Sequence, residues 1–181
     1  MHLNDHEILN LFAQEAKREE AFGHVLRQYQ KPIYYYIRRM VLDHDDADDV
    51  TQNTFIKAWR ALGQFRGESK LSTWLYKIAY HESLTHLNTQ KRIGKVAIEN
   101  VEHELKHHLQ QDSLYTGDEI QMKLQTAMAL LPQKQKAVFV MKYYEEKKYE
   151  EISAITGTSV GALKASFHHA VNKIEAYMSR Q

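Results

Sequence analysis

Two groups of side chains in this sequence have the residue types of a metal site. They are the acidic run Asp43–Asp49, which reads D-H-D-D-A-D-D, and the trio His103, His107 and His108. A calcium loop of the EF-hand type needs a ligand and then a glycine where Ala47 and Asp48 stand, and acids that begin a helix are explained by the helix dipole. The histidine trio lacks a convincing further type of ligand. We therefore predict no metal site, no cofactor and no catalytic residue.

A different chemistry is indicated by aromatic and basic residues on a helix predicted to start near Leu71. Its apolar face is Leu71, Trp74, Leu75 and Ile78, its opposite side presents Thr73, Tyr76, Lys77 and Tyr80, and its end carries Lys91 and Arg92. Rings stack on unpaired bases while cations follow the phosphates, so this outer surface suits single-stranded nucleic acid. The tyrosines would also suit packing against another helix, and Trp74 would suit the core. The residues alone leave both interpretations open.

The C-terminal residues have the layout of a helix-turn-helix. Tyr149, Ile152 and Ile155 form a first apolar face, Thr156 to Ser159 interrupt it, and a second stripe follows at Val160, Leu163, Phe167, Val171 and Ile174. Gly157 suits the positive φ of a tight turn, and Ser159 can cap the second helix. The last helices of an ordinary bundle would show the same pattern.

The face opposite the second stripe carries no bulky side chain. It consists of Ser159, Ala162, Ala165, Ser166, His169 and Lys173, with Lys164 on its flank. A helix lined by alanine and serine can enter the major groove deeply, while Thr158 and Ser159 at its N-terminus can donate to phosphate. This face therefore predicts binding to duplex DNA.

Helices are predicted to position all these residues. Apolar residues recur at helical spacing in sets such as Ile8, Leu11 and Phe12; Phe22, Val25, Leu26 and Tyr29; and Phe55, Ala58, Trp59 and Leu62. No window alternates as a half-buried strand does, and Pro32 and Pro132 stand where helices could begin. Residues 93–117 are polar and weakly periodic. We predict an all-α chain with two small helical domains, 5–92 and 118–180, joined by a flexible linker, 93–117.

Composition narrows the class of protein. Of 181 residues, 43% are hydrophobic and 26% charged, as in a globular protein that buries a core. No apolar run reaches membrane-spanning length, and the first 20 residues lack the features of a secretion signal. The chain has no cysteine, which excludes disulfides and fits a reducing compartment. We expect a cytoplasmic protein without membrane insertion. Its net charge of +1 is low for a nucleic-acid binder, so the placement of the charges matters more than their sum.

Taken in order, these blocks resemble region 2 and region 4 of the extracytoplasmic-function sigma factors of the sigma-70 family. The resemblance covers nearly the whole chain, and its most specific parts are Asp46–Arg60, Phe65–Ser69, Thr73–Ala79, Leu131–Pro132, Tyr149–Ser153 and Gly157–Lys164. It implies an alternative sigma factor that binds core RNA polymerase and directs promoter-specific transcription initiation, with no enzymatic activity of its own.

The resemblance also implies a role for each segment. The helix with Asp49, Gln52, Asn53, Phe55, Ile56 and Trp59 would dock on the β′ clamp of the polymerase. The minus-10 element would be recognised and melted by Arg66, Ser69, Lys70, Thr73, Trp74, Tyr76, Lys77, Tyr80, Lys91 and Arg92, although the loop 65–70 would serve equally as an ordinary connector. The minus-35 element would be read by Thr158, Ser159, Ala162, Lys164, Ala165, Ser166, His169 and Lys173. Further implied partners are the β flap of the polymerase and an anti-sigma factor.

Two departures from the family pattern affect DNA binding. The segment Tyr80–Ser83 reads Y-H-E-S where the family commonly has further basic residues, and His168 and His169 stand where arginine is frequent. Attraction to phosphate is therefore weaker than usual. We expect the free protein to bind DNA poorly and to gain affinity by joining the polymerase.

Two other classes of protein remain as alternatives. A stand-alone helix-turn-helix regulator would need a dimerisation element, which the sequence does not show. A helical metal-dependent hydrolase would need a His-Asp motif that recurs on one helix face, and none is present.

Overall fold

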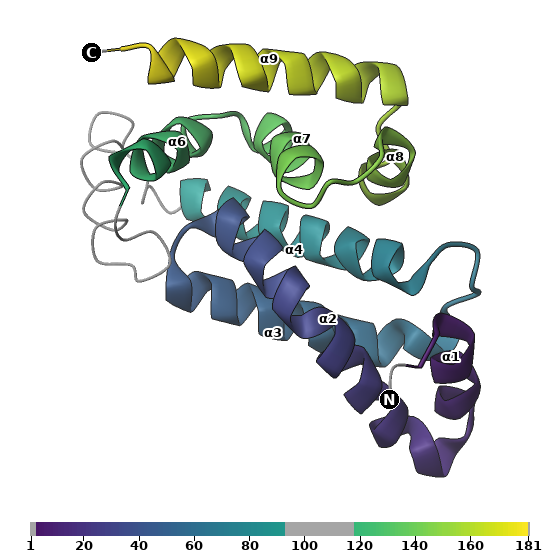
Figure 1. Cartoon of the computed structure of the whole chain (residues 1–181). Helices are drawn as coiled ribbons and strands as arrows, with labels where there is room; N and C mark the ends of the chain where they lie inside the picture. The colour runs from purple at the N-terminus through teal and green to yellow at the C-terminus, as the bar shows by residue number, and fades with distance from the viewer. Residues whose placement is uncertain (1–2, 93–117, 181) are drawn as a thin grey trace. The chain divides into compact units, whose positions relative to one another are not determined.

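The computed structural model of the chain describes residues 3–92 and 118–180 (Figure 1). The predicted linker, 93–117, and the histidine trio within it lie outside these ranges. Every regular element in the described residues is an α-helix or a short 3₁₀ turn, which confirms the all-α prediction. The chain divides into two compact units, whose main bodies run up to Ser83 and from Leu84 onward. The domain limits predicted at residues 92 and 118 stay predictions.

The first unit contains three complete helices and most of a fourth. These are α1 (Asp5–Ala13), α2 (Arg18–Val41), α3 (His44–Ala61) and α4 (Leu71–Arg92), with 3₁₀ turns at Glu15–Lys17 and Leu62–Gln64. The side chain of Asp43 accepts a hydrogen bond from the backbone N–H of Asp46 and so caps α3. The acidic run Asp43–Asp49 therefore begins a helix, as the helix-dipole interpretation predicts.

Asp5 joins three helices of this unit. Its carboxylate accepts a hydrogen bond from the Tyr29 hydroxyl of α2 at 3.1 Å and another from the backbone N–H of Leu71, the first residue of α4, at 2.8 Å. Burial, and then the charge of Asp5, raise the pKa of Tyr29 to about 12. A second tie joins α3 to α4 through the ion pair between Lys57 and Glu82.

The prediction that a helix begins at Pro32 is wrong, because Pro32 lies inside α2. A proline in a helix interior removes one backbone hydrogen bond and crowds the carbonyl four residues earlier. Here the buried residues Phe22 and Val25 precede it, and Ile33 and Ile37 follow it on the same helix. We attribute the uninterrupted helix to the burial of apolar residues on both sides of the proline, which outweighs the local cost.

The second unit holds the remaining helices, except for Ala154–Thr156 at the end of α8. They are α6 (Glu119–Ala129), α7 (Gln133–Tyr143), α8 (Tyr149–Thr156) and α9 (Val160–Met178). Pro132 stands directly before α7, where a helix start was predicted. Helix α9 packs on α6 and α7, with Leu163, Ala170 and Ile174 buried on its inner side. This packing leaves the opposite side of α9 open.

Candidate functional site

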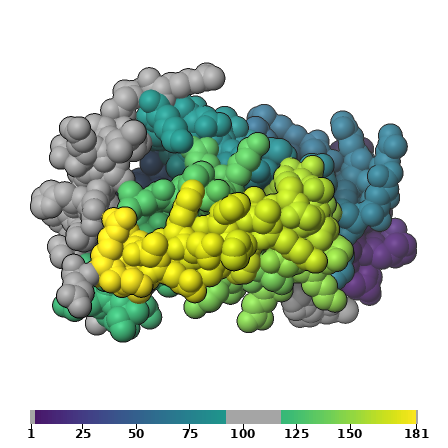
Figure 2. Space-filling model, turned by 90° about the horizontal axis from the view of Figure 1, so that it is seen from above, coloured from purple at the N-terminus to yellow at the C-terminus, as the bar shows by residue number. Residues whose placement is uncertain are grey.

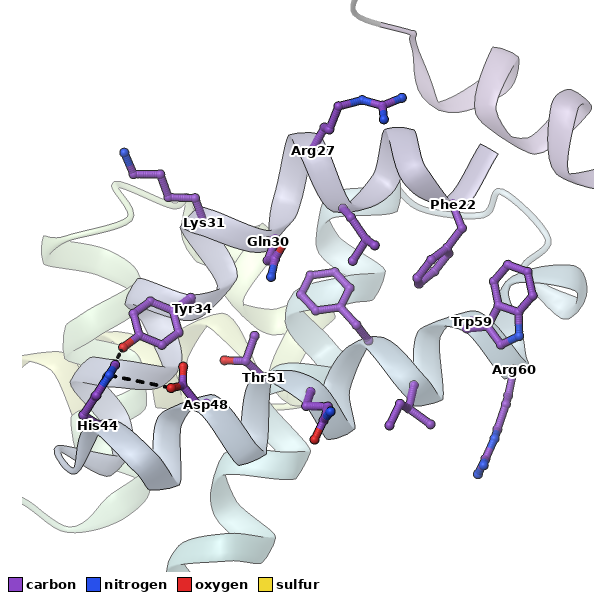
Figure 3. Close-up of a pocket in the computed structure, with 14 residues that line it drawn as sticks. Phe22, Arg27, Gln30, Lys31, Tyr34, His44, Asp48, Thr51, Trp59 and Arg60 are labelled. Atoms are coloured by element: carbon purple, nitrogen blue, oxygen red, sulfur yellow. Dashed lines mark hydrogen bonds and ion pairs between the residues drawn. The ribbon is translucent and has the colours of Figure 1, made fainter. Parts of the chain in front are cut away.

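A groove with a volume of about 1290 Å³ lies between α2 and α3 of the first unit (Figure 3). Its apolar lining comes from both helices and includes Phe22, Leu26, Phe55, Ile56 and Trp59. Basic side chains of Arg27, Lys31 and Arg60 also line it. An elongated groove with an apolar floor and basic residues suits a protein segment that has apolar and acidic side chains.

The six residues that the resemblance assigns to polymerase docking all lie on α3. Asp49, Gln52, Asn53, Ile56 and Trp59 are exposed, whereas Phe55 is buried. Ile56 and Trp59 keep 41% and 38% of their surface exposed, so both can offer apolar area to a partner. Gln52, Phe55, Ile56 and Trp59 line the groove. Their docking role stays a prediction.

The exposed indole of Trp59 is held in place from behind. Its ring meets the ring of Phe22 edge-on at a centroid distance of 5.2 Å and that of Phe12 at 5.6 Å. Phe55 meets Phe22 in the same way at 6.5 Å. Edge-to-face contacts of this kind orient aromatic rings. Trp59 is therefore a fixed surface feature that continues into the core.

The other end of the groove holds a polar cluster. The Tyr34 hydroxyl lies 2.7 Å from Nδ1 of His44, and Nε2 of His44 lies 3.7 Å from a carboxylate oxygen of Asp48 (Figure 3). Burial raises the pKa of Tyr34, and the negative charge of Asp48 adds to this increase. The positive charge of Arg38 opposes it, but the pKa remains above its usual value. Sequence reasoning missed the α2 side of this groove. The spacing of Phe22 and Leu26 marked an apolar face, but only the fold shows that α3 leaves part of it uncovered.

The residues predicted to contact the minus-10 element do not form one outer surface. Arg66, Ser69, Lys70, Lys77 and Lys91 are exposed, Trp74 is half-buried, and Thr73, Tyr76 and Tyr80 are buried. The side chain of Arg92 lies outside the described part of the structure. The prediction that aromatic rings and Lys77 share an exposed face is therefore wrong for both tyrosines.

Packing explains the burial of Tyr76. Its ring meets that of Tyr36 on α2 at 5.4 Å, and only 4% of the residue is exposed. Trp74 instead packs against Phe65 of the preceding loop, with ring centroids 5.1 Å apart. The loop and the start of α4 thus share one aromatic contact near the exposed Lys70 and Lys77. The assignment of these residues to DNA stays a prediction.

The helix-turn-helix layout is confirmed in the second unit. Gly157 ends α8 with φ at 72° and ψ at 13°, and its N–H donates to the Ser153 carbonyl at 2.9 Å. This left-handed conformation favours glycine, as predicted. Ser159 caps α9 by accepting a hydrogen bond from the Ala162 N–H at 3.3 Å. Two local signals therefore set the angle at which α9 leaves the turn.

The outer side of α9 is exposed at most, but not all, of the positions predicted to face DNA. Ser159, Ala162, Lys164, Ala165, His169 and Lys173 are exposed, while Thr158 and Ser166 are half-buried. Figure 2 shows α9 as an uncovered ridge. Nζ of Lys173 donates a hydrogen bond to Oε1 of Gln135, on α7, at 3.0 Å.

Comparisons with known proteins assign the family. The model of sigma-70 region 2 matches residues 25–93, and that of sigma-70 region 4 matches residues 121–174. Over 165 residues the chain is 32% identical to the RNA polymerase sigma-H factor of Pseudomonas aeruginosa, with 87% of this chain and 86% of that protein covered. It is 30% identical, at the same coverage, to the ECF RNA polymerase sigma-E factor of Escherichia coli K12. This chain is an extracytoplasmic-function sigma factor of the sigma-70 family.

Solved structures agree with the fold of this sigma factor. The sigma factor RpoE, in complex with the anti-sigma factor NepR from Bartonella quintana, matches with a TM-score of 0.68 at 22% identity, covering 88% of this chain and 98% of that one. CnrH, in complex with the cytosolic domain of CnrY, matches with a TM-score of 0.65 at 20% identity, covering 93% and 94%.

Metal-ion clusters and membrane-spanning helices are both absent from the part of the chain that the structure describes. Among residues 3–92 and 118–180, no three histidine or acidic side chains gather as they would around a metal ion. None of the helices in the same ranges combines the length and the apolar character needed to cross a membrane.

Proposed function

We propose that this sigma factor binds core RNA polymerase, directs it to a set of promoters and acts without catalytic chemistry of its own. The observation that carries the proposal is the exposure of Ile56 and Trp59 beside the groove on the first unit. A stand-alone regulator has no need of a fixed apolar surface far along the chain from its helix-turn-helix. A polymerase subunit needs one such surface for the enzyme and another for DNA.

The first unit would dock through α3. The indole of Trp59 and the side chain of Ile56 supply apolar area, while Gln52 and Asn53 are exposed on the same helix and can hydrogen-bond to the partner. Aromatic anchors whose rotamers are already fixed lose little conformational entropy on binding, and such residues dominate interface energies. The β′ clamp of the polymerase is the partner we propose for this surface.

The minus-10 element would be contacted by the loop before α4 and by the start of that helix. Exposed Arg66, Lys70 and Lys77 supply positive charge, and half-buried Trp74 offers part of a ring. Because Tyr76 and Tyr80 are buried, we propose that these basic residues and Trp74 make the main contacts with the DNA. A melted strand needs such a surface, since its bases are unstacked and its phosphates are exposed.

The second unit would read the minus-35 element with α9. Ala162 and Ala165 leave room for the groove walls, and Ser159 stands at the N-terminus of the helix, where base-edge and phosphate contacts concentrate in helix-turn-helix proteins. The β flap of the polymerase is the partner we propose for this unit. An anti-sigma factor is a further proposed partner, since one of the similar solved structures is a sigma factor in complex with an anti-sigma factor. All of these partners place its action in the cytoplasm.

Run-off transcription with purified core polymerase on genomic fragments tests the proposal. We expect specific transcripts that require both the chain and the polymerase, and their start sites will report the promoter sequence. Size-exclusion chromatography and a polymerase pull-down distinguish a sigma factor from a stand-alone helix-turn-helix regulator. A dimer that binds an operator without polymerase, and that starts no transcript with it, would identify a stand-alone regulator.

A further inference from the structure

The ring of Tyr149, the first residue of α8, lies within cation–π range of two lysines of the second unit. Nζ of Lys142, from α7, lies 4.8 Å from the ring centroid, and Nζ of Lys164, from α9, lies 5.8 Å from it. Nζ of Lys142 also donates to the carbonyl of Lys147 at 3.2 Å. The ring itself is fixed by an edge-on contact with Phe167 of α9, at 6.4 Å. One aromatic ring thus receives cations from the helices before and after its own.

The charges in this cluster are unbalanced. In the described residues neither Lys142 nor Lys164 forms an ion pair with a carboxylate, and each approaches the ring within cation–π range. Both ammonium groups lie near the same ring, and the negative ring face offsets only part of their charge. An anion would complete the cluster. Lys164 belongs to α9, the helix that we propose enters the DNA groove. The anion that would lie nearest to it is therefore a phosphate of the DNA backbone.

Lysine is a costly phosphate ligand when it is free, because its long side chain loses rotamer freedom on binding. A ring that already holds both ammonium groups lowers that cost. We propose that Tyr149 is a positioning residue that holds Lys142 and Lys164 as a two-lysine grip for the phosphate backbone of the minus-35 duplex. This inference rests on the proposed function of α9.

The ring face of Tyr149, and not its hydroxyl, holds the two ammonium groups. Cation–π attraction arises from the quadrupole of the ring. Within residues 3–92 and 118–180, the Tyr149 hydroxyl makes no hydrogen bond of its own. Phenylalanine should therefore replace Tyr149, whereas an aliphatic residue should not.

The test uses the complete sigma factor with core polymerase on a promoter found by run-off transcription. We expect Tyr149→Phe to bind this promoter as the wild type does, and Tyr149→Leu to bind about three- to tenfold more weakly. The slope of log affinity against log salt should flatten by roughly one unit for Tyr149→Leu and by roughly two for Lys142→Ala with Lys164→Ala. When both lysines have already been replaced by alanine, Tyr149→Leu should cause no further loss of promoter affinity.

A purely structural role predicts a different pattern. In that case Tyr149→Leu would cost as much with both lysines removed as with both present, and that result would overturn the inference. If Tyr149→Leu unfolds α8, pentafluorophenylalanine at position 149 keeps the shape of the ring and removes its attraction for cations. Wild-type affinity for this variant would equally overturn it. If the wild-type holoenzyme itself starts no transcript, the proposed function fails before this inference is reached.

Discussion

The outer faces of α3 and α9 are both exposed, but they relate to the core in opposite ways. On α3, Trp59 is open to solvent on one side and packs on Phe12 and Phe22 on the other. On α9, the open face carries Ala162 and Ala165, while a separate stripe is buried. A protein partner is held by apolar side chains, which need support from behind, whereas a DNA groove admits a helix only where side chains are small.

The largest expected effect sharpens this comparison on α3. Trp59→Ala should lower the free energy of unfolding by about 2 kcal/mol, because it empties the space beside Phe12 and Phe22. It should also weaken core polymerase binding by about 100-fold, because an aromatic anchor is lost. Urea unfolding and a quantitative pull-down measure the two effects.

Ile56→Ser is the matched control, since Ile56 lines the same groove and is similarly exposed. It should weaken polymerase binding by about tenfold and leave the free energy of unfolding within about 0.5 kcal/mol. Normal polymerase binding by both variants would show that the enzyme docks elsewhere.

The second prediction concerns the face of α9. Ala165→Leu should leave the free energy of unfolding within about 0.5 kcal/mol of the wild type, because the residue is exposed. The added bulk should reduce holoenzyme binding to the minus-35 element by about tenfold, through lost groove contacts worth about 1–3 kcal/mol. Ala176→Leu, an exposed change more than two turns further from the N-terminus, is the control. Equal promoter affinities for the two variants would show that α9 does not enter the groove.

A third prediction uses the contact between Tyr29 and Asp5. The pKa of Tyr29 is about 12 in the folded protein and about 10 in an unfolded chain. The folded protein therefore keeps a proton that the unfolded chain releases between pH 10 and 12. This contribution to stability is complete below pH 10 and declines as the pH rises toward 12.

Trp59 and Trp74 both lie in the first unit, so tryptophan fluorescence reports its unfolding. Urea midpoints at pH 9, 10.5 and 11.5 should fall more steeply for the wild type than for Tyr29→Phe. Parallel decreases in the two proteins would contradict the assigned pKa.

The smallest expected effect belongs to Lys173. If it contacts phosphate, Lys173→Ala should weaken binding to all promoters about equally and reduce the salt slope by roughly one unit.

Replacing Ala162, Ser166 and His169 together should instead change the preferred minus-35 sequence and leave the melted element unchanged. Selection from a randomised upstream element separates the two outcomes. An unchanged consensus after the triple replacement would mean that another surface reads the DNA.

Local signals allowed much of this structure to be predicted from the sequence. Gly157 and Ser159 set the turn and the cap of α9 through their own backbone preferences, and both predictions are confirmed. Asp43 begins α3 for a similarly local reason. Interactions of this kind span only a few residues, so they can be predicted from the sequence without knowledge of the fold.

The predictions that failed depend on contacts between distant segments. Helical spacing divides α4 into faces, but it does not reveal that Tyr76 meets Tyr36, forty residues earlier. A proline normally interrupts a helix, and only the packing of both halves of α2 keeps Pro32 inside it. The groove beside Trp59 likewise needs the crossing of α2 and α3, which no local pattern specifies.

The carboxylate of Asp5 affects how this protein can be shortened. The family match to region 2 begins at residue 25, so a fragment cut to that limit would seem a natural choice for study. Such a fragment would lose the acceptor for the first N–H of α4 and would uncover the ring of Trp59 that rests on Phe12. Its α4 would fray at Leu71, and its docking surface would loosen because Phe22, which supports Trp59 and lines the groove, would also be missing. A defect seen in that fragment would reflect the missing α1 and the missing start of α2, so truncation studies of region 2 should start no later than Asn4, which caps α1.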